Sequence, residues 1–244
     1  MVKYHVLTLV KDLGHTKSVI NPILFETGIG LVLFDAGYPN QIKDFESEFS
    51  RLGFSIKDLA VIVISHHDHD HIGSLNDLIS INKNIQIWAN EIEASYICGK
   101  NKSLRLLQAE EYNKTLNDNE KIFGEQFVAY LKTIDTVPVD KVINDNESIC
   151  TGLKVINTFG HTPGHISLYL EEEKILFVGD ALAIEDNKLI IANRQFTLDM
   201  NETVKSIMKI ININVSKVIC YHGNQFIGNV TNSLNELLKN LPNN

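Results

Sequence analysis

The sequence predicts an α+β protein built as a four-layer αβ/βα sandwich, in which two β-sheets pack face to face and helices cover both outer faces. Short apolar runs typical of strands occur in both halves of the chain, and helical apolar patterns accompany each half. A hydrophobic content of 44% with a mean hydropathy of −0.03 is ordinary for a globular protein. We take residues 1–244 as a single domain, because this length is enough to bury a sizeable core.

Strands begin the chain. Residues 4–10 alternate weakly between apolar and polar side chains and predict a strand. Two apolar runs, at 21–27 and 31–35, flank Gly28-Ile29-Gly30, and this arrangement indicates a β-hairpin.

A helix and a buried strand follow. Apolar residues at helical spacing predict a helix over 40–52, which Gly53 ends. The β-branched run at 60–64 is typical of a strand buried on both faces. Apolar spacing then predicts a helix over 72–79, and a short strand is expected at 85–89.

A helical block at 90–135 separates the two β-rich halves. Asn90 is a typical N-cap for a helix that runs to about Ile97, and two further helices are predicted over 103–116 and 123–132. We expect this block to be an insertion, with a lid as its candidate role. Some of its apolar side chains could line a pocket, although we favour a core internal to the block: Tyr96, Leu104, Leu107, Phe127 and Tyr130.

The second half returns to strands and ends in helices. The spacing of Val204, Ile207, Met208 and Ile211 predicts one helix, and leucines from Leu234 to Leu241 predict another. The predicted strands of this half lie at 147–149, 153–158, 166–170, 175–178, 188–191 and 217–220.

The charge balance indicates the class of partner. The chain has 22 basic and 30 acidic residues, a formal charge of −8, which argues against nucleic acid as a partner. Its densest basic stretch, Lys100 and Lys102 with Arg105, is interpreted as a solvated helix face. The expected partner is a small-molecule substrate, and a homodimer is compatible with the sequence.

The expected compartment is the cytoplasm. No segment approaches the ~18 apolar residues that a membrane span requires, and the first five residues lack a signal-peptide pattern. The three cysteines, Cys98, Cys150 and Cys220, form neither a disulfide framework nor a CxxC zinc pattern.

Residues capable of metal binding follow the strand at 60–64. Four histidines fall within six residues, at positions 66, 67, 69 and 71, interleaved with Asp68 and Asp70. Imidazoles and carboxylates in a loop between a strand and a helix can converge on metal ions. Further ligand-type residues occur at or after later strands: His161 in Gly160-His161-Thr162-Pro163-Gly164-His165, Asp180, and His222.

This set resembles the metallo-β-lactamase superfamily. That family has a His-x-His-x-Asp-His motif, then a histidine in a Gly-His-Thr-x-Gly-His turn, then an aspartate and a histidine. The resemblance covers most of the chain, from Phe34-Asp35-Ala36-Gly37 to His222, and implies the metallo-β-lactamase fold.

The resemblance implies two divalent metal ions. The first would be bound by His66, Asp68 and His161, the second by Asp70, His71 and His222, and Asp180 would bridge them. Zinc is the default ion, and iron and manganese are alternatives. Asp35 and His165 are expected to support the ligands through hydrogen bonds, and Asp70 is also a candidate for proton transfer. Cys220 is expected to be buried and not a ligand.

One position departs from the family pattern. Asp68 stands where the family has its second histidine, and His67 and His69 occupy positions that point away from the metal. A one-residue shift would make His67 and His69 the ligands, but Asp70-His71 would then lose register. A third carboxylate should raise the pKa of metal-bound water and favour harder ions.

The expected reaction is hydrolysis. Two cations ~3.5–4 Å apart can bind a bridging hydroxide that attacks a carbonyl or phosphoryl centre. We expect a small-molecule ester, lactone or thioester as the substrate. Acyl-homoserine-lactone hydrolases use a tyrosine after the bridging aspartate, and residues 181–193 contain none. Glutathione thioesters would call for basic residues after His222, where Lys239 alone is found.

Two other functions remain open. A di-iron redox protein that reduces oxygen or nitric oxide is one, because such members replace a first-motif histidine with a carboxylate, as Asp68 does here. A phosphodiesterase or nuclease is the other, although the acidic composition disfavours it.

Overall fold

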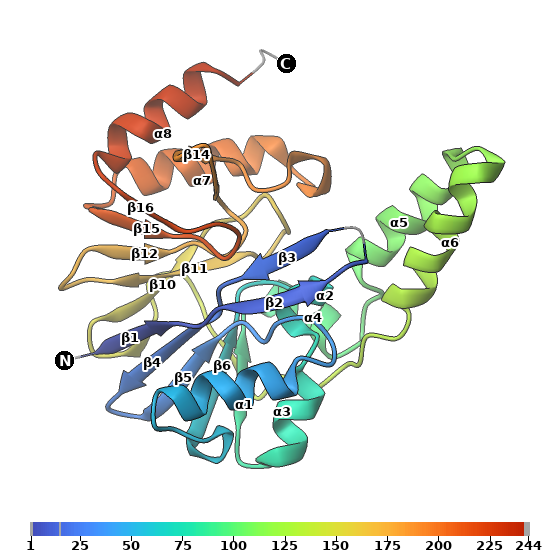
Figure 1. Ribbon diagram of the computed structural model, residues 1–244. Coiled ribbons are helices and arrows are strands. Elements are labelled where there is room, and N and C mark those ends of the chain that lie inside the picture. The colour runs from blue at the N-terminus through green and yellow to red at the C-terminus, as the bar shows by residue number, and fades with distance from the viewer. Residues whose placement is uncertain (1, 15, 242–244) are drawn as a thin grey trace.

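Two six-stranded sheets lie face to face, and helices cover the outer face of each (Figure 1). The computed structural model describes residues 2–14 and 16–241. The predicted αβ/βα sandwich is therefore confirmed.

The first sheet has the strand order β1-β4-β5-β6-β7-β8. It is antiparallel from β1 to β5 and parallel from β5 to β8. Its strands span Lys3–Val6 (β1), Ile23–Thr27 (β4), Gly30–Phe34 (β5), Leu59–Ile64 (β6), Gln86–Ala89 (β7) and Lys141–Val142 (β8).

The second sheet has the order β16-β15-β12-β11-β10-β9, with only the β12–β15 pair parallel. Its strands span Ser148–Cys150 (β9), Leu153–Asn157 (β10), Ile166–Leu170 (β11), Ile175–Phe177 (β12), Lys217–Ile219 (β15) and Gln225–Ile227 (β16). Two short hairpins lie apart from both sheets: β2 (Leu9–Asp12) with β3 (Lys17–Ile20), and β13 (Ala183–Glu185) with β14 (Lys188–Ile190).

Strand β6 shows why the sheets stack in this way. Its residues are apolar throughout, so it can be buried on both faces. Val61 and Val63 enter the core between the sheets, whereas Ile62 and Ile64 point into the core beneath the helices.

Helices cover each outer face. The first sheet carries α1 (Ile42–Arg51), α3 (Leu75–Ile81) and α4 (Glu91–Ile97), and the second carries α7 (Met200–Ile211) and α8 (Val230–Lys239). The short helices are η1 (Ile56–Asp58), α2 (His69–Ile72) and η2 (Arg194–Phe196).

Helices α5 (Leu104–Thr115) and α6 (Asp118–Leu131) form a hairpin that projects from one side of the sandwich (Figure 1). The sequence places the start of α6 at residue 123, five residues too late. The helix begins at Asp118 because Asn117 caps it, accepting hydrogen bonds from the backbone N–H groups of Asn119 and Glu120.

Several other boundaries differ from the predictions. The strand predicted at 4–10 is two strands, β1 and β2, and the helix predicted over 72–79 is interrupted after Ile72. At that interruption Gly73 packs against Pro39, so closely that a Cβ would lie 2.2 Å from the Pro39 nitrogen. Within the described residues, no helix has both the length and the apolar character to cross a bilayer.

Candidate metal centre

Five loops carry the predicted site residues to one edge of the sandwich. Asp35 follows β5, His66 follows β6, His161 lies in the turn after β10, Asp180 follows β12 and His222 follows β15. Loops at a shared strand edge can gather functional side chains on a rigid frame.

The loop after β6 supplies two separate sets of ligand-type side chains. Asp68 is the N-cap of α2 and has an extended backbone, with φ −70° and ψ 150°. His66 and Asp68 therefore precede the helix, whereas Asp70 and His71 lie within its first turn.

The first set joins His66 and Asp68 to His161. Asp68 Oδ2 lies 3.2 Å from His161 Nε2 and 3.5 Å from His66 Nε2. These three side chains are buried, and their ligand atoms all lie within 4.8 Å of one another.

The second set joins Asp70 and His71 to His222. Asp70 Oδ2 lies 3.2 Å from His222 Nε2 and 3.9 Å from His71 Nε2. The ligand atoms of this set also lie within 4.8 Å of one another, and His222 is its most exposed member, with a side-chain exposure of 30%.

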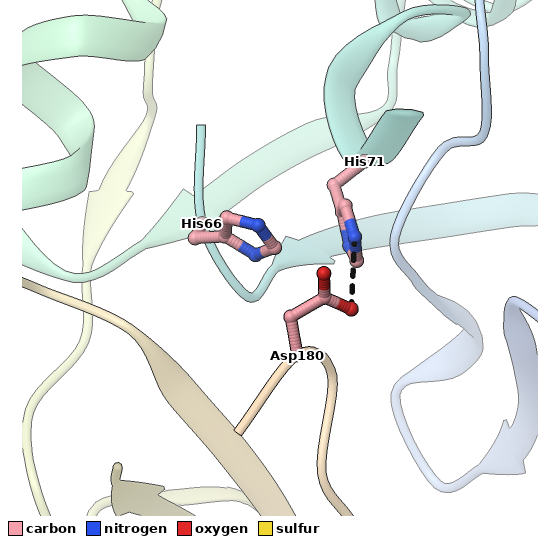
Figure 2. Close-up of side chains that lie close together, drawn as sticks. All are labelled: His66, His71 and Asp180. Atoms are coloured by element: carbon pink, nitrogen blue, oxygen red, sulfur yellow. Dashed lines mark ion pairs between the residues drawn. The ribbon is translucent and has the colours of Figure 1, made fainter. Parts of the chain in front are cut away.

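Asp180 lies between the two sets and directs one oxygen towards each. Its Oδ1 is 3.4 Å from His71 Nε2 and 3.5 Å from His222 Nε2, while its Oδ2 is 3.6 Å from His161 Nε2. Figure 2 shows the Asp180 carboxylate facing His71, with His66 alongside.

The buried polar atoms of these residues fit metal binding. His66 Nε2, His71 Nε2 and Asp180 Oδ1 are buried and have no hydrogen-bond partner. Buried polar atoms are normally satisfied, because an unpartnered one costs free energy. A cation at each set would satisfy these atoms, and nitrogen with carboxylate oxygen is a common donor combination for zinc.

The structure places Asp35 against a ligand-type histidine. Its Oδ2 lies 2.9 Å from His71 Nδ1 and accepts a hydrogen bond from Ser65 Oγ, while its Oδ1 accepts one from the Ser65 N–H. This contact fixes the ring of His71 with Nε2 directed at Asp180.

His165 holds the backbone next to the centre. Its Nε2 accepts a hydrogen bond from the Asp180 N–H at 3.0 Å, and its Nδ1 lies 2.9 Å from Thr158 Oγ1. The imidazole therefore positions Asp180 through the main chain and has no nitrogen free for a metal.

His67 points away from both sets. Its Nδ1 and backbone N–H contact Glu93 Oε2, and its Nε2 accepts a hydrogen bond from the Leu104 N–H. His69 faces the aromatic rings of Tyr38 and Tyr130. Neither histidine belongs to a set of close ligand-type atoms among the described residues.

Glu93 is a structural residue that the sequence did not reveal. It is fully buried, and its Oε1 accepts hydrogen bonds from Thr162 Oγ1 and the Gly164 N–H. Because its Oε2 contacts His67, Glu93 connects the loop after β6 to the turn that carries His161. Its helical spacing resembles that of an ordinary surface carboxylate, so no sequence signal marks it.

Arg105 also enters the centre, and its interpretation as part of a solvated helix face is wrong. Its side chain is only 4% exposed, and Nε and Nη2 lie 3.1 and 2.5 Å from Asp68 Oδ2. Lys102 fits the expectation, because it is 45% exposed and pairs with Glu110. Asp68 itself was the available signal, since a buried extra carboxylate requires a counter-charge.

The carboxylates of the centre are held ionised. Burial alone would raise the pKa of Asp68, but Arg105, His161 and His66 outweigh it and hold that pKa well below its usual value. The pKa of Asp180 is likewise lowered, since His222 and His71 outweigh burial.

The histidines divide into two classes. Burial would lower the pKa of His71 and of His222, but neighbouring aspartates outweigh it and raise both pKa values above the usual 6.5. Burial and neighbouring histidines lower the pKa of His66 and His165.

A cleft of about 450 Å³ opens onto the centre, with Asp68, Asp70, His161, Asp180 and His222 in its wall. Tyr38, Phe127 and Phe196 supply aromatic lining. The expectation of a core internal to the helical block is wrong for two of its residues, because Phe127 lines this cleft and Leu107 is 41% exposed. Cys220 is buried, as expected, at the end of β15.

Comparison with known proteins identifies the family. Residues 15–222 match the family model of the metallo-beta-lactamase superfamily. The probable metallo-hydrolase YflN of Bacillus subtilis is 25% identical over 234 residues, covering 86% of this chain and 82% of YflN. The crystal structure of a metallo-beta-lactamase family protein from Thermus thermophilus, TTHA1429, superposes with a TM-score of 0.72 at 20% identity, covering 96% of this chain and 77% of that one. With the fold, the five loops and the family model in agreement, the chain belongs to the metallo-β-lactamase superfamily.

Proposed function

We propose that this protein is a metal-dependent hydrolase that uses two divalent cations, zinc by default, to cleave a small-molecule ester, lactone or thioester. The observation that carries the proposal is the position of Asp180, which directs one oxygen to each of two ligand sets at the wall of an open cleft. When bound, the cations supply an activated water and polarise the carbonyl that it attacks.

The chain's own residues position this chemistry. Asp35 fixes the ring of His71, and the N–H of Asp180 is held by His165, so the ligand atoms of both sets are preorganised. Asp70 lies at the cleft with His222 against its Oδ2, a position from which it can accept a proton and pass it to a leaving group.

The substrate class is supported by the cleft and by the names of relatives. Uncharged Tyr38, Phe127 and Phe196 line the cleft beside the centre. An N-acyl homoserine lactonase from a Bacillus species is 26% identical over 190 residues, covering 67% of this chain and 64% of that protein. A hydroxyacylglutathione hydrolase from Prochlorococcus marinus is 30% identical over 125 residues, covering 51% and 36%.

Asp68 supports a second candidate function, that of a di-iron redox protein, because carboxylates are hard ligands that suit iron. Its pairing with Arg105 offsets the extra negative charge and reduces this preference. Among the described residues that line the cleft, Arg105 is the one Lys or Arg. The cleft therefore lacks the basic groove that a phosphodiester substrate would favour.

Metal analysis of the untagged protein, followed by a substrate panel, tests the proposal. We expect about two equivalents of zinc and chelator-sensitive hydrolysis of lactones, esters or thioesters in preference to phosphodiesters. Two equivalents of iron with a visible absorption band and no hydrolysis would favour the redox function. A purified protein that takes up no divalent cation contradicts both.

A further inference from the structure

Arg105 crosses from the helical insertion into the first ligand set. It lies on α5, and its Nε and Nη2 both contact Asp68 Oδ2, the same oxygen that faces His66 and His161. Its Nη2 is also 3.4 Å from His161 Nε2. The guanidinium therefore contacts two of the three atoms that would bind the first cation.

The remaining contacts fix the guanidinium in place. Its Nη2 donates to the Phe196 carbonyl at 3.0 Å, its Nη1 donates to Gln108, and its carbon lies 4.6 Å from the centre of the Phe196 ring. A buried arginine with this many donors satisfied is a fixed positive charge and not a mobile clamp for substrate.

The second ligand set has no such cation. Among the described residues, the ion pairs of Asp70, His71 and His222 involve only histidines and aspartates. Asp68 with Arg105 carries a net charge of zero, like the neutral imidazole found at this position in the family pattern, whereas Asp70 keeps its full negative charge.

We propose that Arg105 makes the two cation positions unequal, by weakening the affinity of the His66–Asp68–His161 set for a divalent cation more than that of the Asp70–His71–His222 set. Two positive charges that share one carboxylate oxygen repel each other, and burial reduces the screening of that repulsion. This inference rests on the proposed metal centre but not on the proposed reaction. Arg105 acts through Asp68 and is a positioning residue.

Because Arg105 belongs to α5, the affinity of the first set for a cation should depend on the position of the α5–α6 hairpin. Helix α5 reaches the first set through Arg105, and the Leu104 N–H at its start donates to His67 Nε2 in the same loop, while Gln108 donates to the Gln195 carbonyl. A displacement of the α5–α6 hairpin would remove the guanidinium and strengthen cation binding at the first set.

Titration of metal-stripped protein with Zn²⁺, in competition with a chromophoric chelator, tests the inference. We expect the wild type to bind two equivalents of unequal affinity, and His161→Ala to lose the weaker one, which assigns it to the first set. In Arg105→Met the weaker equivalent should bind at least tenfold tighter, while the affinity of the tighter one changes much less. A merely structural role would weaken binding on removal of Arg105, so the direction of the change is diagnostic.

Two matched variants separate charge from shape. Arg105→Lys keeps the positive charge and should stay near the wild-type affinity, whereas Lys102→Met removes an exposed cation of the same segment and should change neither equivalent. Circular dichroism checks folding, and Arg105→Gln replaces Arg105→Met should the latter fail to fold. Cobalt(II) in place of zinc gives an independent optical signal for each set.

The outcomes are distinguishable. Equal wild-type affinities, or a weaker equivalent that is unchanged or weaker still in Arg105→Met, would overturn the inference. A wild type that binds one equivalent supports it if Arg105→Met binds two and overturns it otherwise. Failure of the wild type to bind Zn²⁺ at all would instead refute the metal centre, and Zn²⁺ binding without hydrolysis would refute only the proposed reaction.

Discussion

At the scale of single residues, Asp180 is the side chain that contacts both ligand sets. Its two oxygens face different ligand sets, and its backbone is held by His165, so one carboxylate ties both sets to the end of β12. Loss of its charge should therefore affect both cation positions, whereas a change at Asp68 should affect only the first.

Asp180→Asn preserves the size of the side chain and removes its charge. We expect both zinc equivalents to bind more than tenfold more weakly, while Asp68→Ala loses occupancy at the first set alone. Metal content after dialysis measures both effects. Asp186→Asn, the same change at an exposed position with φ 48°, serves as the control and should retain two equivalents. Two full equivalents in Asp68→Ala would contradict the assigned ligand set.

The histidines predict how metal binding depends on pH. His71 and His222 have pKa values raised above 6.5 in the metal-free protein, because aspartates outweigh their burial. A cation must displace these protons, so zinc affinity should increase with pH above about 6.5, with protons released on binding. Isothermal titration in buffers of different ionisation enthalpy measures the release. An affinity that is flat between pH 6 and 8 would contradict the prediction.

The same shifts predict the stability of the metal-free protein. A raised histidine pKa stabilises the fold below the unfolded pKa of about 6.5, and that contribution is lost as pH rises through the folded value. The lowered carboxylate pKa values of Asp68 and Asp180 act in the opposite sense, and their contribution is lost in acid. The lowered pKa values of His66 and His165 also act against the fold below about pH 6.5, so urea unfolding of chelated protein should show falling stability above pH 7 and below about pH 6.5, with a further loss below about pH 4. Stability that continues to rise from pH 7 to 9 would contradict it.

The sequence allowed the seven ligand-type residues to be selected, because each has a local marker: a turn motif or the end of an apolar strand. Arg105 and Glu93 have no such marker. Their roles depend on how α4 and α5 pack against the loop after β6, and these contacts join residues 37 and 26 positions apart. Helical periodicity cannot report such long-range pairing.

At the scale of elements, the sandwich could be predicted more fully than its connections. Long apolar patterns marked β6, α1 and α7, whereas β8 and β13 have only two and three residues and give no periodic signal. The break between α2 and α3 depends on the close approach of Gly73 to Pro39, a tertiary contact that overrides the continuous apolar spacing.

Helix α4 holds the loop after β6 in place, because its residue Glu93 contacts His67 in that loop. Glu93→Gln keeps the shape but removes the charge facing His67 and replaces one acceptor oxygen with a donor. We expect a loss of about 1–3 kcal/mol of unfolding free energy, because buried partners are left unsatisfied. Glu91→Gln, on the exposed face of the same helix, should change stability little. Chemical denaturation compares the unfolding free energies of the two variants. Equal effects would show that the contacts of Glu93 do not stabilise the loop after β6.

At the scale of the whole molecule, the α5–α6 hairpin presents an apolar surface beside the metal centre. Four large apolar side chains are exposed on it, Leu107, Tyr112, Ile122 and Phe123. A groove of about 510 Å³ runs between the two helices and η2, and it shares Arg105, Phe127 and Phe196 with the cleft at the metal centre. A substrate bound at the centre could therefore extend an apolar group along the hairpin.

This continuity predicts that the hairpin selects substrates by the length of their apolar part. Phe123 is 69% exposed and lines the groove, so Phe123→Ser should lower kcat/KM for long acyl esters or lactones roughly tenfold, because contact with the ring buries apolar surface. Short acyl substrates do not reach the groove and should be hydrolysed at the wild-type rate. Ile122→Ser is the matched control, since Ile122 is similarly exposed at 58% on the same helix but does not line the groove. A chain-length series measured on the three proteins decides the matter. Equal losses for short and long substrates, or the same loss in Ile122→Ser, would show that the hairpin affects folding or the metal centre and does not bind the substrate.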